Sequence, residues 1–413
     1  RRFPAARHAD FRHLWGGTTA SSISLWTLLL GNAWAVYHLS NSSFWVGVST
    51  FASMSPYLLA PFGGTIADRI ERRRLVRVTR LAAFAITGAL MVLAAVGVLE
   101  VWMVIAFALC QGLVRSVELP ADSALLANVV PQRDLANAVA LSSMTQHGSR
   151  AAGPILAGPL LATVGPEGAY AIAAIFALLA FLSVRRVQTV SRGGVERLAD
   201  VVANLREGVA YVRATGPVAA IFVLVTAHCA LTMSFDAMLP GFSEEHVHGG
   251  DTGFTIMTFG VGMGALIGTF VLSANSAWPR GSLFLATAIV SGASPALMAV
   301  SMNIGSAAVS ASIMGLSQAM FMALSAVLLQ EVLPDAVRGR VMSLYLMVAG
   351  GVMAIANLGF ASAADAIGAP LLFLVPGLVF IVIVLGSFRV GSHLRRIYRD
   401  GRMPGEVAAV PGA

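Results

Sequence analysis

The sequence predicts an all-α membrane protein with twelve transmembrane helices in two pseudo-symmetric halves of six. Three observations predict this fold class: an apolar composition, twelve long apolar stretches, and a segment of the first half that recurs in the second. Of the 413 residues, 57% are hydrophobic and only 11% are charged. Soluble proteins carry about a quarter of their residues as charges. Lipid must therefore replace water over much of this protein's surface.

The predicted spans follow directly from the length of the apolar stretches. A helix needs about 20 mainly apolar residues to cross a bilayer. Twelve stretches meet this condition, at 14–39, 44–67, 75–98, 101–127, 135–163, 167–184, 216–240, 253–274, 282–302, 305–331, 339–364 and 370–388.

A repeated segment relates the two halves. ALLANVVPQRDLANAVAL (124–141) aligns with VLLQEVLPDAVRGRVMSL (327–344) at a constant offset of 203 residues, and Pro131 recurs as Pro334. Each copy lies between the fourth and fifth helix of its half. Duplicated halves with a substrate site between them are typical of secondary transporters that alternate access. Channels and membrane enzymes do not require this duplication, so the repeat is the main sequence argument for transport.

The basic residues predict the orientation. All 27 are arginine, and they gather in alternate connections, whereas the other connections hold acidic residues and no arginine. Because loops rich in basic residues face the cytoplasm, we expect both termini and segment 185–215 on that side. The arginines from Arg69 to Arg80 are interpreted as one loop group, and only Arg115 and Arg150 fall inside apolar spans. The net charge of +7 then reflects topology and not nucleic-acid binding.

These patterns divide the chain into four parts. We expect a first six-helix half at 1–186, a linker at 187–215, a second half at 216–392 and a cytoplasmic tail at 393–413. The linker contains apolar residues at helical spacing, which predicts an amphipathic helix along the membrane surface. These are Leu198, Val201, Val202, Leu205 and Val209.

The sequence contains no specific motif for catalysis, a cofactor or a metal. There is no phosphate-binding GxxxxGK[ST] loop and no HExxH or GxSxG pattern. Cys110 and Cys229 lack the spacing of a disulfide or a metal site. The histidines of the 241–252 connection are interpreted as part of a solvated loop. We therefore expect no enzyme activity, no cofactor and no metal, and the first span is too long to be the core of a cleaved signal peptide.

One loop carries a family resemblance. The segment GTIADRIERRR (64–74) resembles the signature G-x-x-x-D-R-x-x-R-R of the major facilitator superfamily, between the second and third helices. The stretches DFRHLWGG, LPADSALLANVVPQRDLANAVAL and LREGVAYVRATG are similar to the branch of bacterial exporters that includes the enterobactin exporter and the macrolide efflux pumps. The resemblance covers nearly the whole chain. It implies the major facilitator fold, a bacterial cytoplasmic (inner) membrane location and a monomer.

The resemblance also implies roles for particular residues. In the family this loop latches the two halves together, and its second arginine position pairs with an acid of the fourth helix, here Arg72 with Asp122. The second half keeps only Arg280 of a recognisable latch. A Gly-Pro pair in the fifth helix is often associated with antiporters. The implied latch consists of Gly64, Asp68, Arg69, Arg72, Arg73 and Asp122, and the implied packing residues of the fifth helix are Gly153, Pro154 and Gly158.

Charges inside the spans are the functional candidates, because placing a charge within the bilayer is costly. The fourth helix has polar residues spaced four, three and four apart, which places them on one face. Two interpretations of Glu118 compete: it exchanges a proton while an arginine tunes it or holds an anionic part of the substrate, or it forms a permanent ion pair with Arg115. Asp236 is interpreted as a second proton site or an outer gate. The predicted proton-coupling residues are Glu118, Asp236 and His228.

Polar residues on other helices complete the predicted substrate cavity. Several of them are explained equally well by hydrogen bonds between helices. The predicted cavity residues are Asn32, Gln111, Arg115, Glu118, Gln146, His147, Arg150, His228, Gln318 and Asn357.

The sequence predicts a proton-coupled exporter of an amphiphilic small molecule, such as a drug or a siderophore-like metabolite. The expected partners are the substrate, protons and membrane lipids, and the proton gradient is the expected energy source. An importer or lipid flippase of the same fold, and a non-transporting scaffold or sensor, remain as alternatives.

Overall fold

The computed structural model describes residues 4–59, 70–190, 198–275, 278–390 and 392–400, and within these ranges every regular element is a helix. After a short turn at Ala5–Arg7, the first half contains α1 (Ala9–Ser40), α2 (Ser43–Met54) with a 3-10 turn at Ser55–Leu59, and α4 (Arg72–Ala95). It continues with α5 (Val101–Val129), α6 (Gln132–Thr163) and α7 (Pro166–Arg185). The all-α fold class predicted from the sequence is confirmed.

The second half repeats this order after the linker helix α8 (Leu198–Ala214). Its helices are α9 (Gly216–Leu231), α11 (Gly250–Ala274), α12 (Arg280–Ala299), α13 (Ile304–Val332), α14 (Asp335–Ile367) and α15 (Ala369–Val390), followed by α16 (Ser392–Asp400). Short turns at Asp236–Met238, α10 (Leu239–Gly241) and Phe242–His246 connect α9 to α11. Two further turns use glycines with positive φ, Gly165 at 113° and Gly368 at 83°, a conformation that favours glycine.

Nine helical segments of the described chain are long and apolar enough to span a membrane. α1, α2 and α6 lie where the other three spans are predicted. The prediction of multiple apolar helices is confirmed, and the count of twelve stays a prediction.

The seventh predicted span, 216–240, differs from the structure. α9 ends at Leu231, and Thr232 and Ser234 donate side-chain hydrogen bonds to the backbone carbonyls of His228 (2.9 Å) and Cys229 (2.8 Å). Such local bonds compete with the helical ladder, and Pro240 has no backbone N–H to continue it. The break places Asp236 in a separate short turn.

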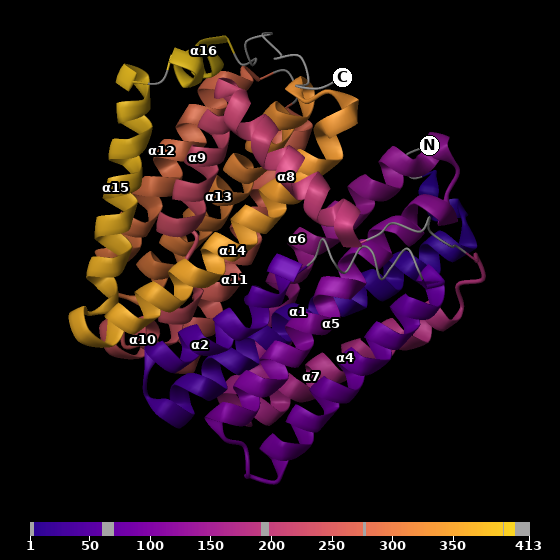
Figure 1. Cartoon of the computed structure of the whole chain (residues 1–413). Coiled ribbons are helices and arrows are strands. Elements are labelled where there is room, and N and C mark those ends of the chain that lie inside the picture. Colours follow the sequence, from indigo (N-terminus) through magenta and orange to yellow (C-terminus); the bar gives the residue numbers. More distant parts are fainter. Residues whose placement is uncertain (1–3, 60–69, 191–197, 276–277, 391, 401–413) are drawn as a thin grey trace.

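The two halves pack on each other mainly through two helix pairs, α2 with α14 and α6 with α11, and α1 also contacts α10 and α11. Figure 1 shows α1 to α7 gathered on one side and α9 to α15 on the other, with α10 and the start of α2 close together at one end. We call this the acidic end, defined by Glu100, Glu167, Glu245, Asp251 and Asp365. The opposite end carries α8, α16 and the arginines of both halves, and we call it the arginine-rich end.

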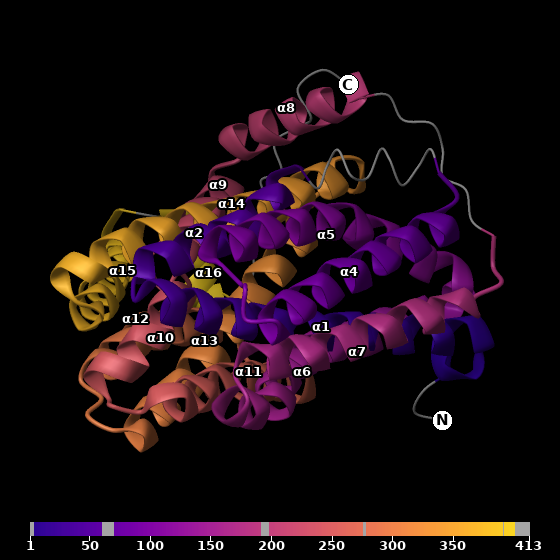
Figure 2. The same ribbon diagram turned by 90° about the horizontal axis from the view of Figure 1, so that it is seen from below.

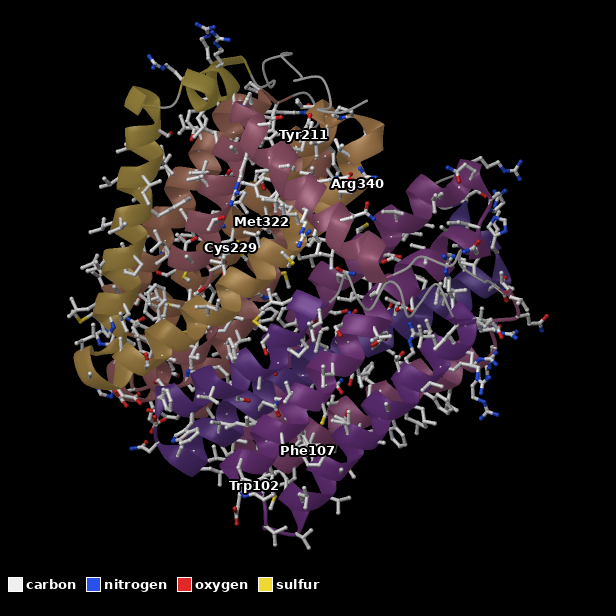
Figure 3. All side chains as sticks on the ribbon, in the orientation of Figure 1. Trp102, Phe107, Tyr211, Cys229, Met322 and Arg340 are labelled. Atoms are coloured by element: carbon white, nitrogen blue, oxygen red, sulfur yellow. The ribbon has the colours of Figure 1, made fainter. Side chains whose placement is uncertain are left out.

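The linker contains the predicted helix, α8, which packs on α9 and α14. Figure 2 shows it lying at the outside of the bundle. Glu207 of α8 forms an ion pair with Arg340 of α14, and Figure 3 shows Arg340 beside Tyr211 at this end of the molecule. Trp102 lies at the acidic end of the first half in the same view, with 61% of its surface exposed, as expected of an aromatic residue at a membrane interface.

Candidate functional site: a central cavity and two clusters of charged residues

A cavity lies between the two halves near the middle of the helices. Its volume, measured as the space open to a water-sized sphere, is about 110 Å³. Most of its lining is apolar, and two charged residues face it. The lining residues are Trp26, Leu29, Leu30, Ala33, Thr50, Met54 and Arg150 from the first half, and Met233, Asp236, Leu239, Phe254, Thr258, Val261 and Met353 from the second.

The two charged residues of the cavity form an ion pair between the halves. The guanidinium Nη2 of Arg150, on α6, lies 3.6 Å from Oδ1 of Asp236, in the turn after α9. The ring of Trp26 lies 4.9 Å from the Arg150 guanidinium carbon, which is a cation–π contact. The Asp236 side chain is 37% exposed and that of Arg150 is 18% exposed, so the carboxylate is the more accessible charge.

The turn that carries Asp236 is held in place by the second half. The backbone N–H of Ala237 donates to the Asn357 side-chain oxygen at 3.5 Å, and the Asn357 amide donates to the carbonyl of Met353 at 3.2 Å. Asn357 therefore holds the turn that carries Asp236, although it is not itself part of the cavity lining. The bond from Ala237 links α14 to this turn, and the bond to Met353 lies within α14.

Glycines bring α6 close to its neighbours around Arg150. A Cβ at Gly153 would lie 3.0 Å from the Thr27 backbone nitrogen of α1, and one at Gly158 would collide with the Thr255 side chain of α11. Pro154 lies within α6 beside them. These residues allow α6 to contact helices of both halves.

A second group of charges is buried inside the first half, between α1, α4 and α5. We call Arg80, Arg115, Glu118 and Asp122 the buried charge cluster. Arg80 lies 2.9 Å from Asp122 and 3.3 Å from Glu118, and Arg115 lies 3.3 Å from Glu118. The Ser21 hydroxyl donates to Glu118 at 3.0 Å. Two carboxylates thus balance two guanidinium groups.

The buried charge cluster corrects two sequence predictions. Asp122 pairs with Arg80, where the family resemblance implies Arg72. The sequence analysis also assigns Arg80 to the loop arginines, yet only 1% of it is exposed. Its position inside the predicted span 75–98 is the signal that could have identified it. Glu118 is also outside the cavity lining, so the geometry favours the ion-pair interpretation of this residue.

Several other predicted cavity residues lie elsewhere. His228 is buried in the second half, where Nε2 and the Ser291 hydroxyl are 2.8 Å apart and the ring stacks on Phe321. The Gln318 amide donates to the carbonyl of Thr232 at 2.6 Å. Both therefore make contacts within the second half in this structure, and their predicted place in the substrate cavity stays a prediction. Gln146 is exposed and is absent from the cavity lining described above.

Asn32, Gln111 and Arg115 line a separate, smaller chamber next to the cavity. The His147 side chain lies outside the described residues, as do Gly64, Asp68 and Arg69 of the predicted latch. Arg73, at the start of α4, donates to Glu71 at 2.8 Å and to the carbonyl of Gln188 at 2.9 Å, which ties α4 to the segment after α7.

Hydrogen bonds join the halves at the acidic end. Tyr37 donates to Glu245 at 2.8 Å, and the Trp34 indole donates to Asp251 at 2.5 Å. His38 lies 3.3 Å from the same Asp251 carboxylate. We call these contacts, together with those of Asp365 below, the acidic-end seal.

Asp365 completes the acidic-end seal from α14. Its carboxylate accepts from the Ser43 backbone at 2.8 Å, the Phe44 backbone at 3.2 Å and the Ser42 hydroxyl at 2.5 Å. An acid of one half thus caps the first turn of α2 in the other half. The sequence pattern of these acids predicts only the orientation, and their contacts between the halves become visible in the structure.

Comparisons with known proteins agree with this architecture. A family model described as "Transmembrane secretion effector" (MFS_3) matches residues 2–397. The chain is 24% identical over 387 residues to macrolide efflux protein A of Streptococcus pyogenes, covering 91% of this chain and 94% of that protein. It is 28% identical over 159 residues to the staphyloferrin A transporter of Staphylococcus aureus, covering 38% of this chain and 40% of that one.

Solved structures show the same fold at low sequence identity. A POT family transporter in complex with a thioalcohol conjugated peptide has a TM-score of 0.74 and 14% identity, and covers 93% of this chain and 96% of that one. The peptide transporter POT in complex with sulfate has a TM-score of 0.74 and 14% identity, with 94% and 95% covered.

Proposed function

Because the chain belongs to the transmembrane secretion effector family (MFS_3) of membrane transporters, we propose that it is a proton-coupled exporter of an amphiphilic small molecule. The proposed orientation puts the arginine-rich end in the cytoplasm, following the preference of basic residues for that side. The proposed location is the bacterial inner membrane. The exporter acts as a monomer and draws its energy from the proton gradient without a cofactor.

The observation that carries the proposal is the central cavity between the halves. An apolar cavity with few polar groups suits an amphiphile, whose apolar body packs against residues such as Leu30 and Phe254. In alternating access, the two halves move about a site between them. The acidic-end seal supports this mechanism, since its hydrogen bonds join the two halves at one end of the molecule.

Asp236 is the proposed proton-coupling residue. Its carboxylate faces the cavity, and its ion-pair partner within the described ranges is Arg150, from the opposite half. Protonation of Asp236 removes that ion pair, so the charge state of one residue changes the attraction between the halves. Glu118 is less suited to this task, because two arginines of the buried charge cluster hold it.

The substrate class rests on the cavity and on the relatives. The name of macrolide efflux protein A indicates a macrolide as its substrate, and that relative aligns over nearly the whole chain. We therefore place a macrolide-like amphiphile first. A siderophore-like metabolite is the second candidate, because the staphyloferrin A transporter aligns over 38% of this chain and Arg150 offers a charge for an anionic group.

Transport into inverted vesicles tests the proposal. In such vesicles the cytoplasmic face is outside, and an imposed acid interior drives an exporter to load substrate. The panel is erythromycin, ethidium and staphyloferrin A, with loading and the pH gradient measured together. We expect wild type to load a panel member while consuming part of the gradient, and Asp236→Asn to lose the gradient-driven loading. Glu167→Gln, which changes an acid away from the cavity, is the matched control.

The other outcomes decide between the alternatives. If Asp236→Asn keeps proton-driven loading and Glu118→Gln loses it, the coupling residue is Glu118 and the assignment to Asp236 fails. If wild type moves panel members only out of the inverted vesicles, the protein is an importer. If it moves none of them and leaves the gradient intact, export of these amphiphiles is excluded.

A further inference from the structure

A small chamber lies inside the first half, separate from the central cavity. It lies between α1, the α2 segment and α5, and the space open to a water-sized sphere is about 20 Å³, enough for one water molecule. Leu25, Leu28 and Leu29 form its apolar side, and Asn32, Tyr57, Gln111 and Arg115 form a polar side, where the Tyr57 hydroxyl is hydrogen-bonded to Arg115. Leu29 lines both the chamber and the central cavity, so one side chain lies between the two spaces.

Three polar atoms at this chamber are buried without a hydrogen-bond partner in the described part of the chain. They are Oδ1 of Asn32, Oε1 of Gln111 and Nε of Arg115. Asn32 is 3% exposed and Arg115 is 7% exposed. Folded proteins nearly always satisfy buried polar atoms, because leaving one unpaired removes the hydrogen bonds it makes to water in the unfolded chain. Three such atoms around one space indicate that a polar molecule occupies it.

The donor and acceptor pattern identifies the class of that molecule. Two of the atoms accept hydrogen bonds and one donates. An ammonium group only donates and would lie beside the positive Arg115, and a carboxylate only accepts and would face two amide oxygens. A water molecule donates two hydrogen bonds and accepts others, so it matches the set. It also matches either orientation of the Asn32 and Gln111 amides, whose oxygen and nitrogen can exchange places.

We propose that this chamber binds water. A buried water needs a polar space of molecular size with about two to four hydrogen-bond partners, and the chamber supplies three. Bound water gives Nε of Arg115 a hydrogen-bond partner. It also brings the buried charge cluster into polar contact with a space next to the central cavity, past Leu29. This inference does not rest on the proposed transport function.

The stability of Asn32→Leu tests the proposal. Leucine has a similar size but no polar atom, and the purified protein is measured in detergent without any substrate. If the chamber binds water, the substitution removes one partner of the water and leaves Gln111 and Arg115 less satisfied. We then expect the Tm to fall by a few degrees. In a dry chamber the same change removes an unsatisfied polar atom, and the Tm stays level or rises.

Thr27→Val provides the matched control. Thr27 is on the same helix, is fully buried, and its hydroxyl also lacks a partner in the described residues, but it is not part of the chamber lining. We expect this variant to keep or raise the Tm. If Asn32→Leu behaves in the same way as Thr27→Val, the chamber is dry and the proposal is wrong.

Radiolytic labelling of the unmutated protein gives an independent measurement. Hydroxyl radicals formed from bound water oxidise adjacent side chains even where bulk solvent does not reach. Leu28 lines the chamber and is 1% exposed, whereas Leu90 is equally buried but is not part of the chamber lining. We expect oxidation of Leu28 at several times the rate of Leu90. Equal rates would overturn the proposal, whatever the folding of the variants.

Discussion

The carboxylate of Asp236 lies 3.6 Å from the guanidinium of Arg150, and this ion pair crosses the central cavity from one half to the other. Its two members come from segments that the sequence separates by the linker helix. The contact depends on the end of α9 at Leu231, which turns Asp236 out of the helix. This ion pair therefore forms only when the two halves are docked as they are in this structure.

The first prediction concerns this pair. Arg150→Gln leaves Asp236 without this partner, and because the Asp236 side chain is 37% exposed, solvent screening limits the loss to about 1 kcal/mol. We expect the initial rate of proton-driven loading to fall about fivefold, since about 1.4 kcal/mol corresponds to a factor of ten. The exchange variant Arg150→Asp with Asp236→Arg restores the pair in reverse. Recovery of part of the loading by the exchange, measured in the same vesicles, would show that the pair itself matters.

The second prediction concerns the acidic-end seal. Ser42 and Asp365 lie on opposite halves and their side-chain oxygens are 2.5 Å apart. We expect Ser42→Cys with Asp365→Cys to form a disulfide under mild oxidation, in a background where Cys110 and Cys229 are replaced by serine. The bond holds the seal closed, so loading stops, and a reducing agent restores it. Undiminished loading by fully cross-linked protein would mean that the seal does not open during transport.

The third prediction concerns the contact between α2 and α14. A Cβ at Gly47 would collide with the Ala361 Cβ of the opposite half. Gly47→Val therefore pushes the halves apart at the acidic end and weakens the seal. We expect a cysteine placed at Ala33, which lines the cavity and makes none of the seal contacts, to react several times faster with an impermeant maleimide than it does with Gly47 intact, in the same cysteine-free background. Gly359→Ala, on α14 with open space around its Cα, is the control that leaves the rate unchanged.

The sequence was sufficient for the helical membrane fold and the linker helix, because hydrophobic length and helical spacing are local properties. It was also sufficient to select Arg150 and Asp236, since charges inside apolar stretches are rare. It did not predict that these two residues pair. Their contact depends on how two halves dock, and no local pattern encodes that.

Arg80 shows a different limit of sequence reasoning. It follows a run of arginines near the start of α4, and all of these residues are of the same type. Composition alone therefore does not indicate that Arg80 is buried while the preceding arginines lie nearer the surface. Glu118 and Asp122 are correctly placed on one helix face, but the face alone does not say whether it meets a cavity or another helix. In the structure it meets Arg80 of α4, and the same charges that suggest a substrate path stabilise the first half instead.

The fourth prediction follows from that arrangement. Arg80→Met leaves Arg115 as the remaining guanidinium of the buried charge cluster, against the two carboxylates of Glu118 and Asp122. Removing one partner of a buried ion pair costs about 3–5 kcal/mol, so we expect a marked fall in Tm and in the amount of folded protein recovered from membranes.

Arg73→Gln is the matched control for Arg80→Met, since Arg73 pairs with Glu71 at the surface, with 22% and 24% of the two side chains exposed. A surface pair contributes about 0–1 kcal/mol, and we expect little change in Tm. The triple variant Arg80→Met, Glu118→Gln and Asp122→Asn removes the uncompensated charges together. If the charges are the cause of the loss, the triple variant is more stable than Arg80→Met alone. If it is equally unstable, the loss comes from the missing packing of the long Arg80 side chain, and the ion pairs contribute little.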